Sequence, residues 1–471
     1  MAQRLDKEQT EELSKRLTYK ERLVWDALGD EERTVALDYG ERYKAFLDAA
    51  RTEREAVDYI ERAARAAGLS DPPGGKRGAI YVNKRKSIAL VRRGRCGLSE
   101  GLRIVVAHID CPRLDLKQKP IFEAAGMAYL DTHYYGGIKK YQWVARPLAL
   151  HGKVIRADGA EVDIRIGSAP EDPVFTVGDL LPHLAYKVQA EKKIAEAIEG
   201  EKLNILAGSL PLGEEEAKKR IKLNLLNILQ ERYGLVEEDL LAAELEAVPA
   251  EPARDVGLDR SLVGAYGHDD RACAFAALEA VLASGEPKFW SIGLFLDKEE
   301  IGSEGATGAK SRFLETIVLD LLRTHELGTG PADLYRVLGQ CQCISADVTG
   351  AMDPHWKEVY EERNVARLGY GPCLSKFTGS RGKYGASDAN AEYVGWLRRV
   401  FNQAGVVWQT GELGKVDEGG GGTVAKDLAV YGMEIIDMGT PVISMHSPFE
   451  VASKADLYMT AKAYRVFLEA D

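Results

Sequence analysis

Hydrophobic and polar positions follow two periods along this chain, and the period changes with position. In the first 66 residues apolar side chains recur at helical spacing with few breaking residues, as in Asp30–Ala50, which predicts helices. The segment Asp71–Gly75, with its Pro-Pro-Gly-Gly run, interrupts this pattern. Apolar runs typical of strands follow it at Ala79–Asn83, Ser87–Arg92 and Leu102–His108.

The middle of the chain, from about residue 121 to residue 255, has a different pattern of apolar and charged residues. Short strand-like runs, for instance Lys153–Arg156 and Glu161–Ile166, come first. Two charged helical stretches follow, Leu184–Glu199 and Glu214–Tyr233. The segment Ala247–Ala253, rich in Pro, Glu and Ala, is typical of a linker. This region is therefore predicted to be a separate, smaller domain.

From Asp255 onward apolar strands alternate with helical patterns, the strands being Ser291–Leu296, Cys341–Ala346 and Pro441–Met445. This alternation predicts an α/β fold with a mixed, mostly parallel sheet that is flanked by helices. We expect residues 1–120, with the N-terminal helices, and residues 256–471 to form one catalytic domain. Residues 121–255 would be an inserted, β-rich domain that serves dimerisation or assembly.

Composition and charge exclude several classes of protein. Hydrophobic residues make up 45% and charged residues 29% of the 471 positions, as in globular proteins. The formal net charge of −11 argues against a nucleic-acid partner, since such surfaces usually carry a basic excess. The chain contains no run of 18 apolar residues, so no membrane helix is predicted. The N-terminus lacks the apolar core of a secretory signal. Six sparse cysteines favour reduced thiols and a cytoplasmic location.

Candidate metal ligands stand at the carboxyl ends of predicted strands. They are His108, the pair Glu299 and Glu300, Asp347 and His446. In open α/β sheets, sites form outside these strand ends, so four separate segments would point at one crevice. A fifth segment, with Asp269 and Asp270, precedes the Ala-rich helical run Ala272–Leu282. Taken singly, His108 is also compatible with a core histidine, and Asp347 with a turn.

Two imidazoles and three carboxylates without a thiolate suit zinc, cobalt or manganese. Five protein ligands exceed what one open catalytic zinc accepts, and a carboxylate that bridges two ions would resolve the excess. One glutamate of the 299–300 pair would then bind metal, and its neighbour would act as general base. The glycine run Gly419–Gly422 is compatible with a flexible turn or with a backbone wall for substrate.

These motifs together resemble the aspartyl aminopeptidase (aminopeptidase I) family of dinuclear zinc exopeptidases. The resemblance covers roughly residues 75–465 and is carried, in family order, by His108-Ile-Asp110-x-Pro112, Asp269-Asp270, Asp297-x-Glu299-Glu300-x-Gly302-Ser303, Ser345-Ala-Asp347 and Met445-His446-Ser447. It implies the zinc-exopeptidase type of α/β fold, two divalent ions per subunit with zinc favoured, and peptide substrates.

The resemblance also implies a role for each motif residue. His108 and Asp347 would hold one ion, Glu300 and His446 the other, and Asp269 both. Glu299 would be the general base that deprotonates the attacking water. Asp110 would orient His108, as carboxylates beside ligating histidines do. The Asp269–Asp270 peptide bond would be cis.

Further implications concern assembly and specificity. Members of the family form homo-oligomers, typically tetrahedral dodecamers, and His133 would reach the active site of a neighbouring subunit. The chain departs from the family pattern at Asp270, where Asn is usual, at residues 348–355, and at residues 135–143. If the substrate is acidic, Lys376, Arg381 and Lys383 are candidate cations, although an ordinary basic loop would have the same sequence.

The resulting prediction is a metal-dependent aminopeptidase that removes single N-terminal residues, with a preference for Asp or Glu as one possibility. Two alternatives stay open. One is a related two-metal dipeptidase, carboxypeptidase or deacylase, and the other is a non-catalytic assembly protein on the same fold.

Overall fold

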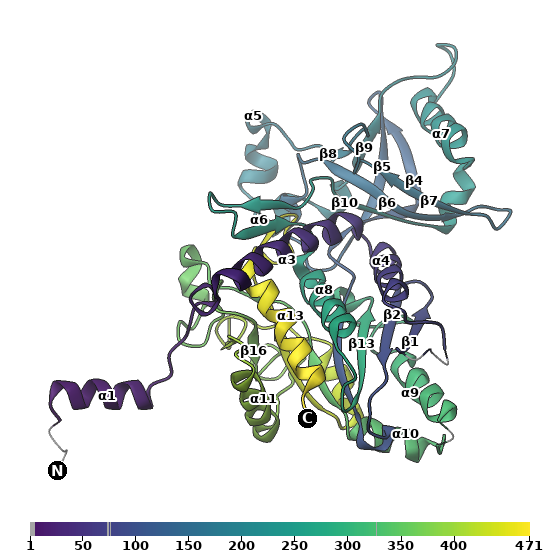
Figure 1. The fold of residues 1–471 in the computed structure, drawn as a ribbon. Coiled ribbons are helices and arrows are strands. Elements are labelled where there is room, and N and C mark those ends of the chain that lie inside the picture. Colours follow the sequence, from purple (N-terminus) through teal and green to yellow (C-terminus); the bar gives the residue numbers. More distant parts are fainter. Residues whose placement is uncertain (1–4, 73–74, 76, 326) are drawn as a thin grey trace.

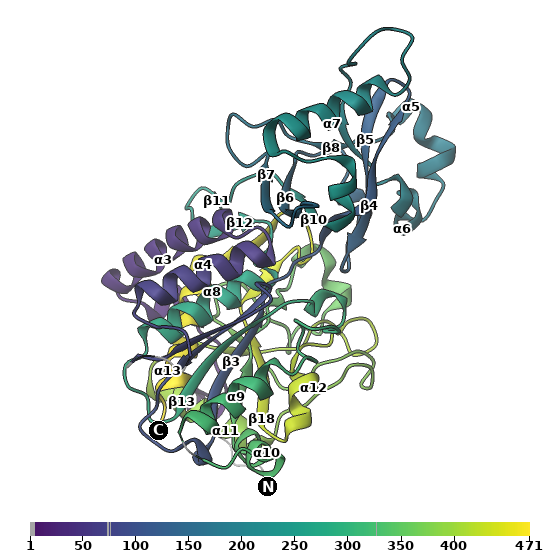
Figure 2. The ribbon, with the colours of Figure 1, turned by 90° about the vertical axis from the view of Figure 1, so that its right-hand side faces the viewer.

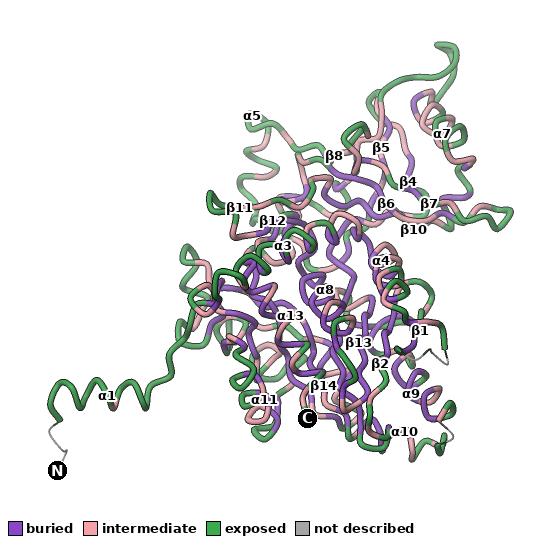
Figure 3. The backbone as a smooth tube through the Cα atoms, in the orientation of Figure 1, coloured by how far each residue is buried: buried purple, intermediate pink, exposed green. Residues whose placement is uncertain are grey.

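The computed structural model describes residues 5–72, 75, 77–325 and 327–471. Two bodies of different size are stacked in Figures 1 and 2, the smaller one formed by the middle of the chain. Helix α1 (Lys7–Leu17) projects from the larger body, and Figure 3 shows it exposed along nearly its whole length. In the described part of the chain no helix is long and apolar enough to cross a membrane.

An eight-stranded mixed sheet forms the centre of the larger body, which confirms the predicted α/β class. Its four neighbouring strands β13, β3, β14 and β18 run parallel, and antiparallel strands join them on both sides. In sheet order the strands are β1 (Ala79–Asn83), β2 (Ser87–Arg92), β13 (Trp290–Leu296), β3 (Leu102–His108), β14 (Gln342–Ser345), β18 (Glu434–Gly439), β16 (Cys373–Ser375) and β17 (Gln409–Thr410).

Helices cover both faces of this sheet (Figure 2). Alternate residues of a strand point to opposite faces, so Val105 and Ala107 of β3 join one hydrophobic core while Ile104 and Val106 join another. The first core is built with α3 (Asp30–Ala49), α4 (Glu53–Ala66), α8 (His268–Ala283), α11 (Ala391–Gln403) and α13 (Lys454–Glu469), and the second with α9 (Phe313–Thr324), α10 (Pro331–Gly339) and α12 (Ala425–Leu428). Burial on both faces explains why these strands are continuously apolar.

A seven-stranded antiparallel sheet forms the smaller body, with a hydrophobic core of its own. Its strands, in sheet order, are β7 (Glu161–Ile166), β6 (Leu148–Ile155), β10 (Ala243–Pro249), β4 (Arg113–Ala124), β5 (Met127–Tyr135), β9 (Ile205–Gly208) and β8 (Thr176–Val177). The expected domain limit at residues 120 and 121 falls inside β4, and the limit at residues 255 and 256 falls inside β11 (Arg254–Val256).

Three local predictions in this body were wrong. Ala247–Pro249 is part of strand β10, not of a linker, because Ala247 and Val248 are buried and pair with β6. The stretch 184–199 is broken into α5 (Pro182–Ala185), a π turn (Tyr186–Ala190) and α6 (Ile194–Ala197), since it has almost no buried side chains to stabilise one helix. Helix α7 (Arg220–Tyr233) begins six residues later than expected, where Glu123 caps the main-chain N–H groups of Ile221 and Lys222.

A third sheet of five strands lies where the larger and the smaller body meet (Figure 2). Its order is β11, β12 (Leu262–Ala265), β20 (Glu450–Ser453), β19 (Pro441–Ile443) and β15 (Thr349–Gly350). The run Pro441–Met445 was expected in the main sheet, and this was wrong. Strand β18 takes that place beside β14, and the chain passes from one sheet to the other at Thr440. Of the expected break at Asp71–Gly75, residues 73 and 74 lie outside the described residues.

Candidate metal centre

The predicted ligands come from five separate segments and meet at one place. His108 ends β3, Glu300 stands in a 3₁₀ turn after β13, and Asp347 follows β14 by two residues. Asp269 opens α8 in a non-helical conformation, and His446 follows β19. The peptide bond between Asp269 and Asp270 is cis, as the family resemblance implied.

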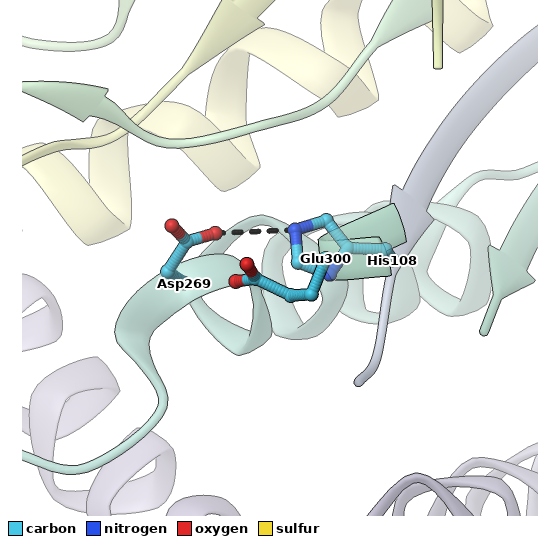
Figure 4. Close-up of side chains that lie close together, drawn as sticks. All are labelled: His108, Asp269 and Glu300. Carbon is cyan, nitrogen blue, oxygen red and sulfur yellow. Dashed lines mark hydrogen bonds and ion pairs between the residues drawn. The ribbon is translucent and has the colours of Figure 1, made fainter. Parts of the chain in front are cut away.

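Asp269 lies between the two histidines. Its Oδ1 is 3.1 Å from Nε2 of His108, and its Oδ2 is 3.2 Å from Nε2 of His446. Each imidazole has a second carboxylate nearby, because Asp347 Oδ1 is 3.9 Å from His108 Nε2 and Glu300 Oε2 is 3.6 Å from His446 Nε2. Figure 4 shows Asp269, Glu300 and His108 converging on one point. The site therefore has two halves that share one carboxylate.

Hydrogen bonds at Nδ1 orient both imidazoles. His108 Nδ1 donates to the main-chain carbonyl of Asp110 at 3.0 Å and lies 3.2 Å from its carboxylate. His446 Nδ1 donates to the carbonyl of Gly137 at 2.8 Å. With Nδ1 protonated in each ring, the lone pair of Nε2 faces the carboxylates, which is the tautomer that metal ligation requires.

Asp110 also holds the turn that carries the two glutamates. Its Oδ1 accepts the main-chain N–H of Glu299, and its Oδ2 accepts that of Glu300, both at 3.2 Å. The hydroxyl of Tyr135 donates to Oδ2 at 2.8 Å. One fully buried carboxylate thus links strand β3, the 299–300 turn and strand β5 of the smaller body.

Electrostatic repulsion is strong inside the cluster. Burial, and then the charge of Asp269, raises the pKa of Glu300 well above its usual range, and burial with Asp270 does the same for Asp347. Burial works against the charged form of His108, yet hydrogen bonds to Asp110 and Asp269 raise its pKa well above the ordinary value. Carboxylates packed this closely need protons or cations among them.

Two further acids at the site were not predicted as participants. Asp270 can form a three-ligand group with His108 and Asp347, and its Oδ1 accepts the N–H of Val348 at 3.2 Å. Glu450 accepts the main-chain N–H groups of Asp269 at 3.2 Å and of His446 at 2.7 Å, and burial raises its pKa to about 8. Glu450 opens a short strand, and no spacing signal in the sequence marks it.

A cavity of about 1030 Å³ opens onto the cluster. Asp269, Glu299, Glu300, Asp347 and His446 line it, and Gly419–Gly422 form part of the lining together with the loops around Gly379 and Gly414. A side chain at Gly420 would place its Cβ 2.1 Å from the carbonyl oxygen of Gly379, so only glycine fits there. The run is therefore a backbone wall of the cavity, one of the two possibilities that the sequence left open.

The cations of the cavity differ from those proposed from the sequence. In the described part of the chain, the lining includes Lys415 and Lys426 but not Lys376, Arg381 or Lys383. Burial raises the pKa of Glu299 and raises that of Asp437 to about 6, and the positive charge of Lys426 opposes the rise in both.

Comparisons with known proteins point to one family. A family model described as aminopeptidase I zinc metalloprotease (M18) matches residues 46–468. A probable M18 family aminopeptidase 1 from Thermotoga maritima is 48% identical over 437 residues, or 92% of this chain and 95% of the relative. One from Clostridium acetobutylicum is 46% identical over 457 residues, or 94% and 97% of the two chains.

Solved structures are similar as well. The crystal structure of an M18 aminopeptidase from Thermotoga maritima has a TM-score of 0.92 at 46% identity and covers 96% of this chain and 100% of that one. The mApe1 dodecamer of Saccharomyces cerevisiae has a TM-score of 0.73 at 20% identity, with 92% and 96% covered, and this likeness concerns the fold alone.

Proposed function

This chain belongs to the aminopeptidase I family of zinc metalloproteases (M18), and from that premise we propose that it removes single N-terminal residues from peptides with two metal ions per subunit. Membership makes the protein a zinc aminopeptidase, a hydrolase that acts on peptides. The observation that carries the two-metal proposal is the position of Asp269, whose two oxygens each face a different imidazole at 3.1 and 3.2 Å.

The residues of the cluster fit divalent cations. In our proposal His108 and Asp347 would hold one ion, Glu300 and His446 the other, and Asp269 would bridge. Nitrogen and oxygen donors of this kind are typical of catalytic zinc sites. Within the described residues, Glu300 Oε1 and Asp270 Oδ2 are buried without a hydrogen-bond partner. A cation held by Glu300 would satisfy its unpartnered oxygen, and positive charge would offset the burial and repulsion that raise the pKa of Glu300 and Asp347.

When bound, a pair of divalent ions supplies Lewis-acid polarisation of the scissile carbonyl and makes water acidic enough to ionise near neutral pH. We assign the proton transfers to Glu299. It lines the cavity beside the cluster, and its main chain is held by Asp110, so its carboxylate is free for this task. Glu299 would accept a proton from the attacking water and pass it to the leaving amine. Asp110 would act through His108, by fixing the orientation of its ring.

We assign recognition of an acidic first residue, the finer part of the proposal, to Lys426. A negatively charged side chain needs a cation in the cavity wall, and Lys426 is a lining residue near Glu299. Its side chain is 29% exposed and its nearest carboxylate, that of Asp427, is 3.9 Å away. The Asp427 side chain is only 7% exposed, but 3.9 Å is long for an ion pair, so the ammonium group is available to a substrate.

We also propose that the chain assembles into a homo-oligomer, with a dodecamer as the expected form. The support is the likeness in fold to the mApe1 dodecamer and the position of His133, which is exposed on β5 next to the exposed Tyr134. In the described part of the chain, His133 does not line the cavity of its own subunit. Any role of His133 at an active site would therefore be in a neighbouring subunit. A cytoplasmic location remains our expectation from the cysteines.

The proposed activity is tested with four aminoacyl substrates (Asp, Glu, Leu and Lys), assayed after removal of metal and after addition of zinc, cobalt or manganese. A free and an N-acetylated tetrapeptide are compared by mass spectrometry. We expect residues to leave one at a time from the free amine only. Cleavage from the carboxyl end, or of the acetylated peptide, would instead support a carboxypeptidase or a deacylase. A zinc-loaded oligomer that cleaves neither peptide would support an assembly protein.

A further inference from the structure

The smaller body reaches the metal cluster through three consecutive residues, Tyr135, Gly136 and Gly137, at the end of β5. The Tyr135 hydroxyl donates to Asp110 Oδ2 at 2.8 Å. The Gly137 carbonyl accepts from Nδ1 of His446 at 2.8 Å. Gly136 has a φ of +75°, and a Cβ on it would lie 3.2 Å from Glu300 Oε2. Each residue of this segment therefore touches a different part of the site.

A buried ion cluster holds this segment against the larger body. The guanidinium group of Arg113 stacks on the Tyr135 ring at 3.9 Å. Arg113 pairs with Glu246 of β10 at 3.1 Å and with Glu53 of α4 at 3.4 Å. Lys86, in the turn between β1 and β2, pairs with Glu53 at 2.9 Å.

The cluster also resists local movement of the segment. The side chains of Arg113, Glu53 and Glu246 are at most 6% exposed. Parting such buried ion pairs leaves charges uncompensated in the interior and is costly. The contacts of residues 135–137 with the metal site are thus fixed relative to both bodies.

We propose that Tyr135–Gly137 is a positioning segment through which the smaller domain sets Glu300 and His446 for metal binding. The Gly137 carbonyl keeps the proton on Nδ1 of His446 and so leaves Nε2 free as a donor atom. Gly136 lets the backbone approach the Glu300 carboxylate more closely than any side chain would allow. The inference rests on the proposed ligand roles of Glu300 and His446, and it gives the inserted domain a task at the site besides assembly.

The test compares two glycine-to-alanine variants. Gly126, in the turn between β4 and β5, has the same φ of +75° as Gly136, but nothing lies within 4 Å of a Cβ built on it. Gly136→Ala and Gly126→Ala thus carry the same backbone strain, and only the first displaces Glu300. Zinc bound per chain is measured by elemental mass spectrometry across a series of chelator-buffered zinc concentrations, together with the melting temperature and the oligomer size.

We expect Gly126→Ala to bind zinc as the unmodified protein does. Gly136→Ala should bind one of its two ions about 10- to 100-fold more weakly, the usual effect of disturbing groups that orient metal ligands, and should keep the other ion. Equal zinc affinity in the two variants would overturn the inference. An unmodified protein with fewer than two ions per chain would count against the proposed ligand set instead.

A second pair of variants covers the case in which Gly136→Ala does not fold. Tyr135→Phe removes only the hydroxyl that holds Asp110. Tyr393→Phe removes another buried hydroxyl, which donates to the Cys343 carbonyl at 2.9 Å. Weaker zinc binding in Tyr135→Phe alone supports the positioning role. The same zinc affinity in both, with similar losses of stability, would show that Tyr135 has a structural role only.

Discussion

Replacing Glu299 by glutamine separates proton transfer from metal binding. The substitution keeps the volume and shape of the side chain and removes its basicity. The hydrogen bond that anchors this residue runs from its main-chain N–H to Asp110, so the introduced glutamine would be held in the same place. Because our proposed ligand set excludes Glu299, the variant should keep its metal and its fold.

The expected loss follows from the role of this carboxylate. Positioned general bases contribute roughly 10²- to 10⁴-fold to rate, which corresponds to about 2.7–5.4 kcal/mol of activation free energy at about 1.36 kcal/mol per factor of ten. Glutamine cannot accept the proton from water, so this whole contribution should disappear from kcat. KM should change little, since the residues assigned to metal and substrate binding are untouched.

The neighbouring residue provides a matched control. Glu300→Gln is the same chemical change one position along the chain, at a side chain that is 3% exposed and 3.6 Å from His446 Nε2. Both variants are assayed for kcat and KM on aminoacyl substrates, for zinc per chain and for melting temperature. Glu299→Gln should retain two ions with low kcat, and Glu300→Gln should lose affinity for one ion.

Two results would refute this reasoning. A kcat for Glu299→Gln within a few-fold of the unmodified protein would exclude the general-base role. Loss of zinc from Glu299→Gln to the same extent as from Glu300→Gln would mean that the assignment of base and ligand within the pair is wrong.

Three other predictions concern metal, specificity and stability. Removal of metal by a chelator should abolish peptide hydrolysis and added zinc should restore it, and activity that persists in demonstrably metal-free protein would contradict the mechanism. Lys426→Gln should lower kcat/KM for Asp and Glu substrates by an amount that corresponds to about 1.5–3 kcal/mol of activation free energy, the scale of a hydrogen bond to a charged group. The effect on Leu should be small, and an unchanged Asp-to-Leu ratio of kcat/KM would exclude this cation. Arg113→Met should destabilise the fold by roughly 3–5 kcal/mol, because the buried Glu53, whose pKa Arg113 and Lys86 hold below its usual range, loses one of these two cations. Ionised Glu53 contributes to the free energy of unfolding above the pKa that this group has in the unfolded chain, and the contribution is lost as the pH falls. The melting curves of variant and unmodified protein should therefore differ most near pH 7 and converge as the pH falls below about 4.

Short-range patterns were enough to predict much of the larger body. Strands β1, β2 and β3 have the limits expected from their apolar runs. For β2 and β3 the reason is that a strand buried on both faces must be continuously apolar. Four of the five candidate ligands were recognisable because polar groups directly after apolar strands lie at the edge of a sheet, whereas Asp269 stands before a helix. The candidate ligands and Glu299 were therefore nominated without tertiary information, and the role of Asp110 followed from the family resemblance.

Interactions between distant segments were not accessible in this way. Nothing local to Pro441–Ile443 tells which sheet it joins. The strand that pairs with β14 is β18, although it carries two acidic residues, because that pairing depends on packing across the whole domain. Ala247–Pro249 has the composition of a linker, yet it becomes a strand because β6 offers it a partner and the core buries it. Local composition is a weak determinant where long-range pairing satisfies the backbone.

The sequence by itself determined the α/β class and indicated an inserted region and the residues proposed for the metal centre, because these depend on apolar periodicity and on residue type at strand ends. Only the tertiary structure decided how the centre is held. Glu450 beside Asp269 and His446, and Tyr135–Gly137 against Asp110, Glu300 and His446, come from segments that carry no chemical signal of their own. Their contribution is a matter of distance and direction, and both arise only when two domains and three sheets are packed together.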